Sequence, residues 1–474
     1  MSIEDFRSQG YQMIDIICDY LSDVESQRVR PDVLPGYLSA TLPSEAPELP
    51  QPFADVVADV KGKIIPGVVH WQHPSFFAYF GANVSAPAML ADMWSSAINM
   101  IGFSWAAAPV STELEMVMMD WLARLCGLPA RFLFASGGPG GGVIQGTSSE
   151  AVLVALLAAR AAAMKDRPVA DRLKLVAYSS DQAHSGFKKA CMIAGVDLVR
   201  LLPTSAADEY ALQPGALSAA MAADLGAGLI PFYVCGTIGT TSSCAVDPVG
   251  DMALVAHRFK AWMHVDAAYA GSASMCPEQR HFFTGLEHVD SYSFNPHKWM
   301  LTNFDCCACW FADAGPLKEA LSLTPVYLRG LGNALDYKDW QIPLGRKFRS
   351  LKLYFVLRQY GAESLREYLR HHMALAQWFG ERVREDARFQ LVAPVRFGLV
   401  CFRLTGATNK VNASLLDAIN KDGSMFLIAT ELSSQHTIRL AIGSTSTQLR
   451  HVRQAWLAIQ KHATAVLSET AAVL

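Results

Sequence analysis

The sequence has few charged residues and no charge excess that would suit a nucleic acid. Charged residues make up 18% of the 474 residues, hydrophobic residues make up 51%, and the formal net charge is −3. No polybasic run is present, so we expect neither a nucleic acid nor an anionic membrane surface as a partner. A balance this apolar predicts that much surface is buried, in a large core and between subunits.

The sequence also lacks a hydrophobic run long enough to cross a membrane. The apolar segment from Ala151 to about Met164 is too short and is interrupted by Arg160. The N-terminus carries Glu4 and Asp5 where a signal or transit peptide would carry basic residues. We therefore expect a cytoplasmic protein with reduced thiols, whose ten cysteines need not pair.

No complete metal-binding or nucleotide-binding motif is present. Cys306 and Cys309 have Cys-x-x-Cys spacing, but no second pair completes a zinc site and the surrounding run is apolar. That context favours a buried strand, and we expect no metal. The glycine-rich segment 137–142 is not followed by the Lys-Ser or Lys-Thr of a nucleotide P-loop.

The order of the predicted elements indicates an α/β protein with three regions. Residues 1–80 carry helical segments, such as Phe6 to Leu21, and form an N-terminal helical segment. From residue 81 to about 360, strands and helices alternate, which is typical of a mostly parallel sheet with helices on both faces. Residues 361–474 place short strands, 399–404 and 437–441, between helices, which predicts a small α+β domain.

Two short apolar strands each lead to one charged residue. Residues 262–265 lead to Asp266, and residues 291–294 lead to Lys298. Pyridoxal phosphate chemistry requires such a pair, because a lysine holds the aldehyde carbon as a Schiff base and a carboxylate keeps the pyridine nitrogen protonated. The alternative is that the two residues are solvated or paired with each other.

A phosphate site is predicted where the glycine-rich segment leads into a helix. Thr147 and Glu150 fit a capping box, which marks a helix N-terminus. The unpaired amides of that first turn, with the hydroxyls of Ser148 and Ser149, form a cradle for an anion. The alternative is simply a well-capped helix after a flexible loop.

His184 is a third candidate. It follows a predicted strand, 173–178, and a predicted turn, 179–182, and it begins a helix. A histidine just past the carboxyl end of a strand lies where ligands bind in open α/β sheets. Taken by itself, it is better explained as a histidine that satisfies a turn.

Ordered motifs along almost the whole chain carry a family resemblance. They are PGYL at 35–38, WQHP at 71–74, GFSW at 102–105, GVIQG at 142–146, SDQAH at 180–184, HVDAAYAG at 264–271, NPHKW at 295–299 and WQIPLG at 340–345. With them the chain resembles the aromatic L-amino-acid decarboxylases that depend on pyridoxal 5′-phosphate, a group that includes dopa decarboxylase and plant tryptophan and tyrosine decarboxylases. The resemblance implies an aspartate aminotransferase-like fold (fold type I).

The resemblance also implies roles for the cofactor site. Lys298 looks like the Schiff-base lysine and Asp266 like the partner of the pyridine nitrogen. His184 resembles the histidine that stacks on the cofactor ring and meets the substrate carboxylate. The phosphate-binding positions are matched by Ser148, Ser149, Asn295 and His297, and residues lining the cofactor are matched by Thr241 and Ala268.

The substrate pocket implied by the resemblance is aromatic and is shared between two subunits of a homodimer. Its positions are matched by Trp71, Tyr79, Phe80, Ile101 and Phe103, although ordinary packing would explain the same residue types. Gly345 matches a position where glycine leaves room for an indole, which favours tryptophan or 5-hydroxytryptophan. Gly81 and Ala82 depart from the usual proline and hydroxyl residue, which leaves recognition of ring substituents open.

Tyr327 matches the tyrosine that returns a proton to Cα in this family. Related aldehyde synthases carry phenylalanine there, so Tyr327 favours simple decarboxylation to the amine. The segment from Tyr327 to Trp340 looks a few residues shorter than usual, which keeps an aromatic acetaldehyde synthase as the alternative. A catalytically silent, phosphate-binding homologue is a third possibility, against which intact Lys298, Asp266 and His184 argue.

Overall fold

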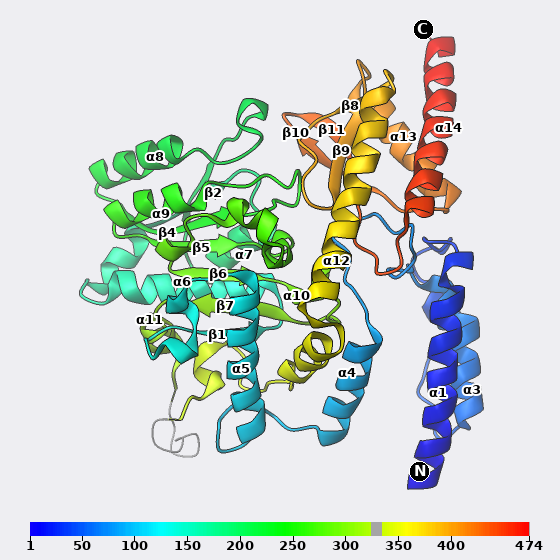
Figure 1. The fold of residues 1–474 in the computed structure, drawn as a ribbon, viewed down its shortest axis with the longest axis horizontal. Helices are drawn as coiled ribbons and strands as arrows, with labels where there is room; N and C mark the ends of the chain where they lie inside the picture. Colours follow the sequence, from blue (N-terminus) through cyan, green and yellow to red (C-terminus); the bar gives the residue numbers. More distant parts are fainter. Residues whose placement is uncertain (324–333, 474) are drawn as a thin grey trace.

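The structure is a computed structural model that describes residues 1–323 and 334–473 (Figure 1). The predicted N-terminal helix is present as α1 (Ile3–Asp23), which begins at a complete capping box between Ser2 and Asp5. It is followed by α2 (Tyr37–Thr41), α3 (Phe53–Asp59) and α4 (Ala86–Ile98). No residue of α1 is buried, and α1 and α3 stand beside the rest of the molecule (Figure 1).

A seven-stranded sheet forms the centre of the molecule. In spatial order its strands are β1 (Gly141–Gln145), β7 (Cys307–Phe311), β6 (Ser291–Phe294), β5 (Trp262–Asp266), β4 (Ile230–Thr237), β2 (Leu175–Ser180) and β3 (Leu198–Leu202). Strands β6, β5, β4, β2 and β3 run parallel, and β7 pairs antiparallel with both β1 and β6. The prediction of a mostly parallel sheet is confirmed.

Helices cover both faces of this sheet, as predicted, and alternate strand residues separate the two cores. One core contains Val234 and Val265 with residues of α5 (Pro109–Cys126), α8 (Pro214–Gly226) and α9 (Val249–Arg258). The other contains Tyr233 with α6 (Ser148–Met164), α7 (Ser185–Ile193) and α11 (Gly315–Leu321). Successive strand side chains point to opposite faces, so adjacent residues such as Tyr233 and Val234 enter different cores.

The C-terminal part of the chain builds a second, antiparallel sheet. The long helix α12 (Ser350–Glu385), which bends at Gly361, leads to strands in the spatial order β10 (Ile428–Leu432), β11 (Gln435–Ala441), β9 (Leu399–Leu404) and β8 (Phe389–Leu391). Helices α13 (Asn409–Asp422) and α14 (Leu449–Val473) accompany it (Figure 1). Strands 399–404 and 437–441 therefore lie where the sequence predicted them.

Two local predictions were wrong in part. The strand predicted at 173–178 is β2, and it begins at Leu175 because residues 169–174 form a 3-10 helix. Ser179 and Ser180 were predicted in a turn but lie in the buried strand, where the Ser179 hydroxyl donates to the Cys235 carbonyl at 2.6 Å. A satisfied hydroxyl costs little to bury, which explains Ser179, whereas the buried Ser180 hydroxyl has no hydrogen-bond partner among the described residues.

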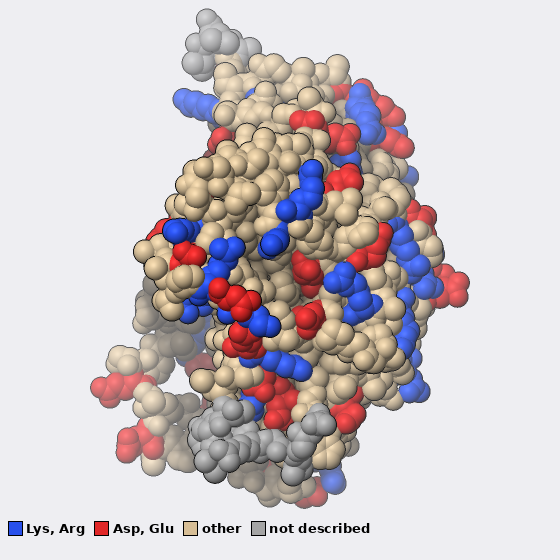
Figure 2. All heavy atoms as spheres, turned by 90° about the vertical axis from the view of Figure 1, so that its left-hand side faces the viewer, with Lys and Arg blue, Asp and Glu red and all other residues tan. Residues whose placement is uncertain are grey.

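The surface charges and the helices of the structure agree with the low net charge and the lack of long apolar runs in the sequence. Figure 2 shows acidic and basic side chains interspersed over the face that it presents. Among the described residues, no helix is both long enough and apolar enough to span a membrane.

Candidate active site

Asp266 and Lys298 meet at one edge of the seven-stranded sheet. Asp266 is the last residue of β5, and Lys298 lies in the short helix α10 (Pro296–Trp299) that follows β6. Since β5 and β6 are parallel neighbours, with Asp266 opposite Ser293, their carboxyl ends open on the same side. A small cleft of about 40 Å³ lies there and is lined by Phe80, Ser148, His184, Thr237, Gly239, Thr241, Asp266, Ala268, Tyr269 and Lys298.

The backbone around Asp266 fixes its carboxylate. Asp266 is 8% exposed, and its Oδ1 accepts a hydrogen bond from the Ala268 amide at 2.9 Å. The next residue, Ala267, donates its amide to the Ser293 carbonyl, which continues the pairing beyond the strand. The carboxylate is thus held on the rigid sheet rather than on a loop.

Lys298 presents an amine that forms no ion pair with any residue that the structure describes. Burial lowers its pKa below the ordinary value, and the Asp266 carboxylate opposes this effect. A lysine whose pKa is lowered has a larger fraction of neutral amine, which is the nucleophilic form.

The N-terminus of α6 provides hydrogen-bond donors at the cleft. Thr147 caps the helix by accepting from the Glu150 amide, as predicted, but the Glu150 carboxylate accepts from Gly146 instead of from Thr147. Only half of the predicted capping box is therefore formed. The Ser148 hydroxyl lines the cleft and donates to Asn295 Oδ1 at 2.8 Å, which connects α6 to the segment that carries Lys298.

His184 is the N-cap of α7, so the predicted helix start is confirmed. Its Nδ1 accepts from the Gly186 amide at 3.0 Å, which assigns the proton of the neutral ring to Nε2. Burial lowers the pKa of His184, while Asp266 and Lys298 act on it in opposite directions. At neutral pH the ring is therefore neutral and carries one N–H donor.

Other predicted cofactor residues lie at different distances from the cleft. Thr241 and Ala268 line it. Ser149 does not line it, and its hydroxyl would lie 3.2 Å from a methyl group on Gly186. His297 is 4% exposed and its Nδ1 accepts from the Cys306 amide at 2.9 Å, while burial lowers its pKa to about 3.

The predicted substrate residues fall into two groups. In the first group, Trp71 and Tyr79 stack with ring centroids 5.6 Å apart, and they are 40% and 44% exposed. Phe80 is buried and stacks on Tyr269 at 3.7 Å inside the cleft. Tyr79 has a positive φ of 57°, which turns the chain between the exposed and the buried ring.

The second group lies outside this cleft. Ile101 and Phe103 flank Gly102, whose amide donates to the Arg346 carbonyl, so segment 101–103 runs beside Gly345. Ile101 is 56% exposed, and a methyl group on Gly345 would lie 3.8 Å from its side chain. Within one chain, Ile101 and Gly345 are exposed, Phe103 is half-buried, and none of the three lines the cleft.

Comparison with known proteins identifies the family. Residues 35–405 match the pyridoxal-dependent decarboxylase conserved domain. The chain belongs to the pyridoxal-dependent decarboxylase family. It is 49% identical to the aromatic-L-amino-acid decarboxylase of Bos taurus, with 98% of both chains covered, and 47% identical to the phenylacetaldehyde synthase of Arabidopsis thaliana, covering 98% of this chain and 97% of that one. The crystal structure of Oryza sativa TDC with PLP and tryptamine superposes with a TM-score of 0.96 at 44% identity, over 98% of this chain and 99% of that one.

The cleft of this decarboxylase fits the cofactor of its family. Pyridoxal phosphate carries an aldehyde, a basic ring nitrogen and a phosphate. Lys298 offers an amine without an ion-pair partner among the described residues, Asp266 offers a buried carboxylate, and the α6 N-terminus with Ser148 offers donors for an anion. The predicted cofactor, pyridoxal 5′-phosphate, thus agrees with both the family and the donor set.

Some residues that line the cleft of the decarboxylase were not predicted from the sequence. Thr237 ends β4, Gly239 follows it closely, and Tyr269 belongs to the same motif as Asp266. Their positions at or just past strand ends could have indicated them. Arg439 lies near Lys298 but belongs to β11 of the other sheet, so no motif around it in the sequence indicated a position at the cleft.

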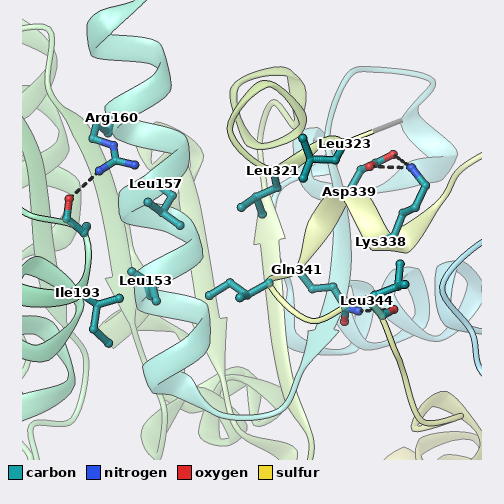
Figure 3. Close-up of a pocket in the computed structure, with 12 residues that line it drawn as sticks. Leu153, Leu157, Arg160, Ile193, Leu321, Leu323, Lys338, Asp339, Gln341 and Leu344 are labelled. Carbon is teal, nitrogen blue, oxygen red and sulfur yellow. Dashed lines mark hydrogen bonds and ion pairs between the residues drawn. The ribbon is translucent and has the colours of Figure 1, made fainter. Parts of the chain in front are cut away.

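A larger cleft elsewhere in the decarboxylase does not have this chemistry. It has a volume of about 500 Å³ and lies between α6, α7 and segment 338–344 (Figure 3). Leu153 and Leu157 form part of its wall, and Lys338 at its edge pairs with Asp339 at 2.8 Å. None of the predicted catalytic residues lines it, and Tyr327 lies outside the described residues.

Proposed function

We propose that this chain decarboxylates an aromatic L-amino acid to the corresponding amine and carbon dioxide, with pyridoxal phosphate attached to Lys298. The observation that carries the proposal is the meeting of Lys298, Asp266, His184 and the α6 N-terminus in one cleft. The aromatic substrate is supported by the names of the relatives and by the stacked rings of Phe80 and Tyr269 in that cleft.

Each residue of the cleft has a proposed role that follows from its chemistry. When bound, the cofactor draws electrons away from Cα of the amino acid, so that a carboxylate there can leave as carbon dioxide. Asp266 would hold a proton at the ring nitrogen, and Ser148, with Ser149, Asn295 and His297, would hold the phosphate region. His184 would donate from Nε2 to the substrate carboxylate. Thr241 and Ala268 would line the ring.

Tyr327 would return a proton to Cα. A phenol at that position favours the amine as product, which is why decarboxylation leads and the aromatic acetaldehyde synthase stands second. Similarity to a phenylacetaldehyde synthase keeps that second activity open. For the substrate we favour tryptophan or 5-hydroxytryptophan, because Gly345 has no side chain beside Ile101.

We also propose a homodimer in which the partner completes the active site. Helix α1 has no buried residue, although Phe6, Ile14 and Ile17 lie on it, and an isolated helix gains little stability without a packed apolar face. A groove of about 660 Å³ with an almost entirely apolar lining separates α1 from α4. On α4, Met93 and Trp94 are about half exposed, at 48% and 58%.

Ile98 at the end of α4 and Ile101 just beyond it are also exposed, at 40% and 56%, which supports a partner subunit at this part of the predicted substrate pocket. A second copy that covers α1 and α4 would bury these side chains and bring a second set of Ile101, Phe103 and Gly345 to a cleft. We further propose residues 1–80 as the dimer-forming segment, 81–360 as the large cofactor-binding domain and 361–474 as the small domain. The ten free cysteines, nine of them buried, support a reducing, cytoplasmic location.

The activity is tested with a panel of aromatic amino acids and the Lys298→Ala variant. The purified wild type should show a visible absorption band from bound cofactor and release amine and carbon dioxide. Lys298→Ala should fold but show no turnover, because the attachment point is lost while the sheet is intact. Substantial decarboxylation by Lys298→Ala would refute the assignment.

The homodimer is tested by light scattering during size-exclusion chromatography. The wild type should have twice the chain mass of 51.6 kDa. Ile14→Glu and Trp94→Glu should weaken the dimer, whereas Leu254→Glu, at a 51% exposed leucine on α9, should not. A wild-type mass of one chain would contradict the proposal.

A further inference from the structure

Arg439 is a buried cation without a carboxylate partner among the described residues. It lies on β11, is 1% exposed, and its Nη2 donates to the Tyr79 carbonyl at a long 3.4 Å. Its Nε and Nη1 have no hydrogen-bond partner in the part of the chain that the structure describes. Buried charges in proteins are nearly always paired, so a guanidinium in this state calls for a functional explanation.

Arg439 and Lys298 both lie close to the ring of Phe80. The Arg439 Cζ lies 5.0 Å from the centre of the Phe80 ring, and Lys298 Nζ lies 5.9 Å from the same centre. The two cations are therefore within about 11 Å of each other. Phe80 is itself fixed by stacking on Tyr269 at 3.7 Å. The arrangement brings the small sheet to the reactive lysine of the large one.

Six titratable groups act on Lys298 from the elements around it. They are Asp266 on β5, Arg439 on β11, Cys307 on β7, Cys244 before α9, His184 at α7 and His297 in α10. Burial raises the pKa of both thiols and lowers the pKa of both imidazoles, so these four groups are neutral at neutral pH. The charged groups that remain are the Asp266 carboxylate and the Arg439 guanidinium, which stays protonated even when buried.

We propose that Arg439 is a positioning residue that keeps the Lys298 amine uncharged and reactive, by offsetting the attraction of the Asp266 carboxylate for a proton on that amine. The inference rests on the proposed function, in which Lys298 carries the cofactor. A neutral amine has the lone pair that forms a bond to an aldehyde carbon, with loss of water, whereas an ammonium group does not. In agreement, burial is the main cause that lowers the pKa of Lys298, Asp266 raises it, and the Arg439 charge lowers it further.

The test follows cofactor attachment rather than turnover. Pyridoxal phosphate is added to the cofactor-free protein across a range of pH, and the rate at which the visible band appears is recorded. In the wild type the rate should reach half its maximum below pH 10.5, the ordinary pKa of lysine. Arg439→Met should move this midpoint up by about one pH unit, as expected for a unit charge at this distance in a partly screened site. Arg439→Lys keeps the charge and should stay close to the wild type.

Arg403→Met is a matched control. Arg403 is a buried arginine on the neighbouring strand β9 that donates to the Ala407 carbonyl, and it is not among the groups that act on Lys298. Its loss should disturb the small sheet without moving the midpoint. If the pH midpoint shifted equally in Arg439→Met and Arg403→Met, the shift would result from disturbed packing and not from the Arg439 charge, and the proposal would be overturned.

The remaining outcomes are also decisive. A wild-type midpoint at or above 10.5 overturns the proposal without any variant, so it stays testable if Arg439→Met does not fold. An unchanged midpoint in Arg439→Met with a raised KM for the amino acid overturns it too, and would make Arg439 a substrate-binding residue. If the wild type forms no visible band at any pH, the proposed function itself fails, which is a different result.

Discussion

The buried ion pair between Glu115 and Arg346 is a sharp test of how the segment around Gly345 is held. Both side chains are 1% exposed. Glu115 Oε1 also accepts from the Ile144 amide at 2.7 Å, and Arg346 donates to Gln341 Oε1 at 2.6 Å. Glu115→Gln keeps an acceptor for Ile144 but leaves the guanidinium without its counter-charge. Breaking a buried pair in this way costs about 3–5 kcal/mol.

This loss of unfolding free energy converts to a decrease in the melting temperature, Tm. Unfolding entropy is about 2.1 cal/mol/K per residue, so a cooperative chain of 474 residues has about 1 kcal/mol/K, and Glu115→Gln should lower Tm by about 3–5 °C. Scanning calorimetry at one scan rate and one protein concentration measures this shift. KM for the preferred amino acid should rise as well, because Arg346 directly follows Gly345 and its carbonyl accepts from Gly102.

Glu113→Gln is the control for this prediction. Glu113 lies on the same helix, is exposed, and accepts from the Trp105 indole at 2.8 Å, which glutamine can also do. Its Tm should change by less than about 1 °C. A Glu115→Gln variant that melts as close to the wild type as this control would show that the charge of the pair contributes nothing.

Three further predictions concern the product, pH and the substrate. Tyr327→Phe should still release carbon dioxide, but amine should fall while aldehyde, ammonia and hydrogen peroxide rise; an unchanged ratio of amine to peroxide would remove Tyr327 from proton delivery. The hydrogen bond to the Asp290 carboxylate raises the pKa of His257. The pair of protonated His257 and Asp290 therefore stabilises the folded state at low pH, and this stabilisation is lost as pH rises through the raised pKa. His257→Gln should therefore lower Tm more at about pH 5.5 than at about pH 8.5, and an equal loss at both would exclude the charged pair. Gly345→Ser makes only an ordinary van der Waals contact with Ile101, at 3.8 Å, and should fold, but it should shift kcat/KM from indole towards phenol substrates; a constant ratio of kcat/KM values would exclude position 345 from recognition.

The sequence predicted best those elements whose pattern is local. Strands β5 and β6 are short apolar runs with clear ends, so the sequence alone places Asp266 and Lys298 at neighbouring strand ends. The family and fold type I were predicted from the resemblance that ordered motifs along the chain carry, and they are confirmed by the comparisons. The roles of the individual site residues remain predictions.

Contacts between distant parts of the chain could not be predicted. Arg439 and Tyr79 are 360 residues apart, and nothing in the pattern of β11 shows that its arginine reaches the Tyr79 carbonyl. The start of β2 was missed because Leu173 is apolar yet 78% exposed, which hydrophobic spacing cannot reveal. The spacing of α1 predicts a helix but does not say which molecule covers it.

The residues proposed for the cofactor and those proposed for the substrate lie on different kinds of element, and this difference affects how the enzyme can evolve. Asp266 sits in the sheet ladder and Lys298 in the short helix that follows β6, so few substitutions there would be tolerated. Tyr79, Ile101 and Gly345 lie on connecting segments, where side chains can change without breaking strand pairing. Mutation can therefore explore new amino-acid side chains while the bond-breaking groups stay in place, so substrate preference is free to drift faster than the reaction.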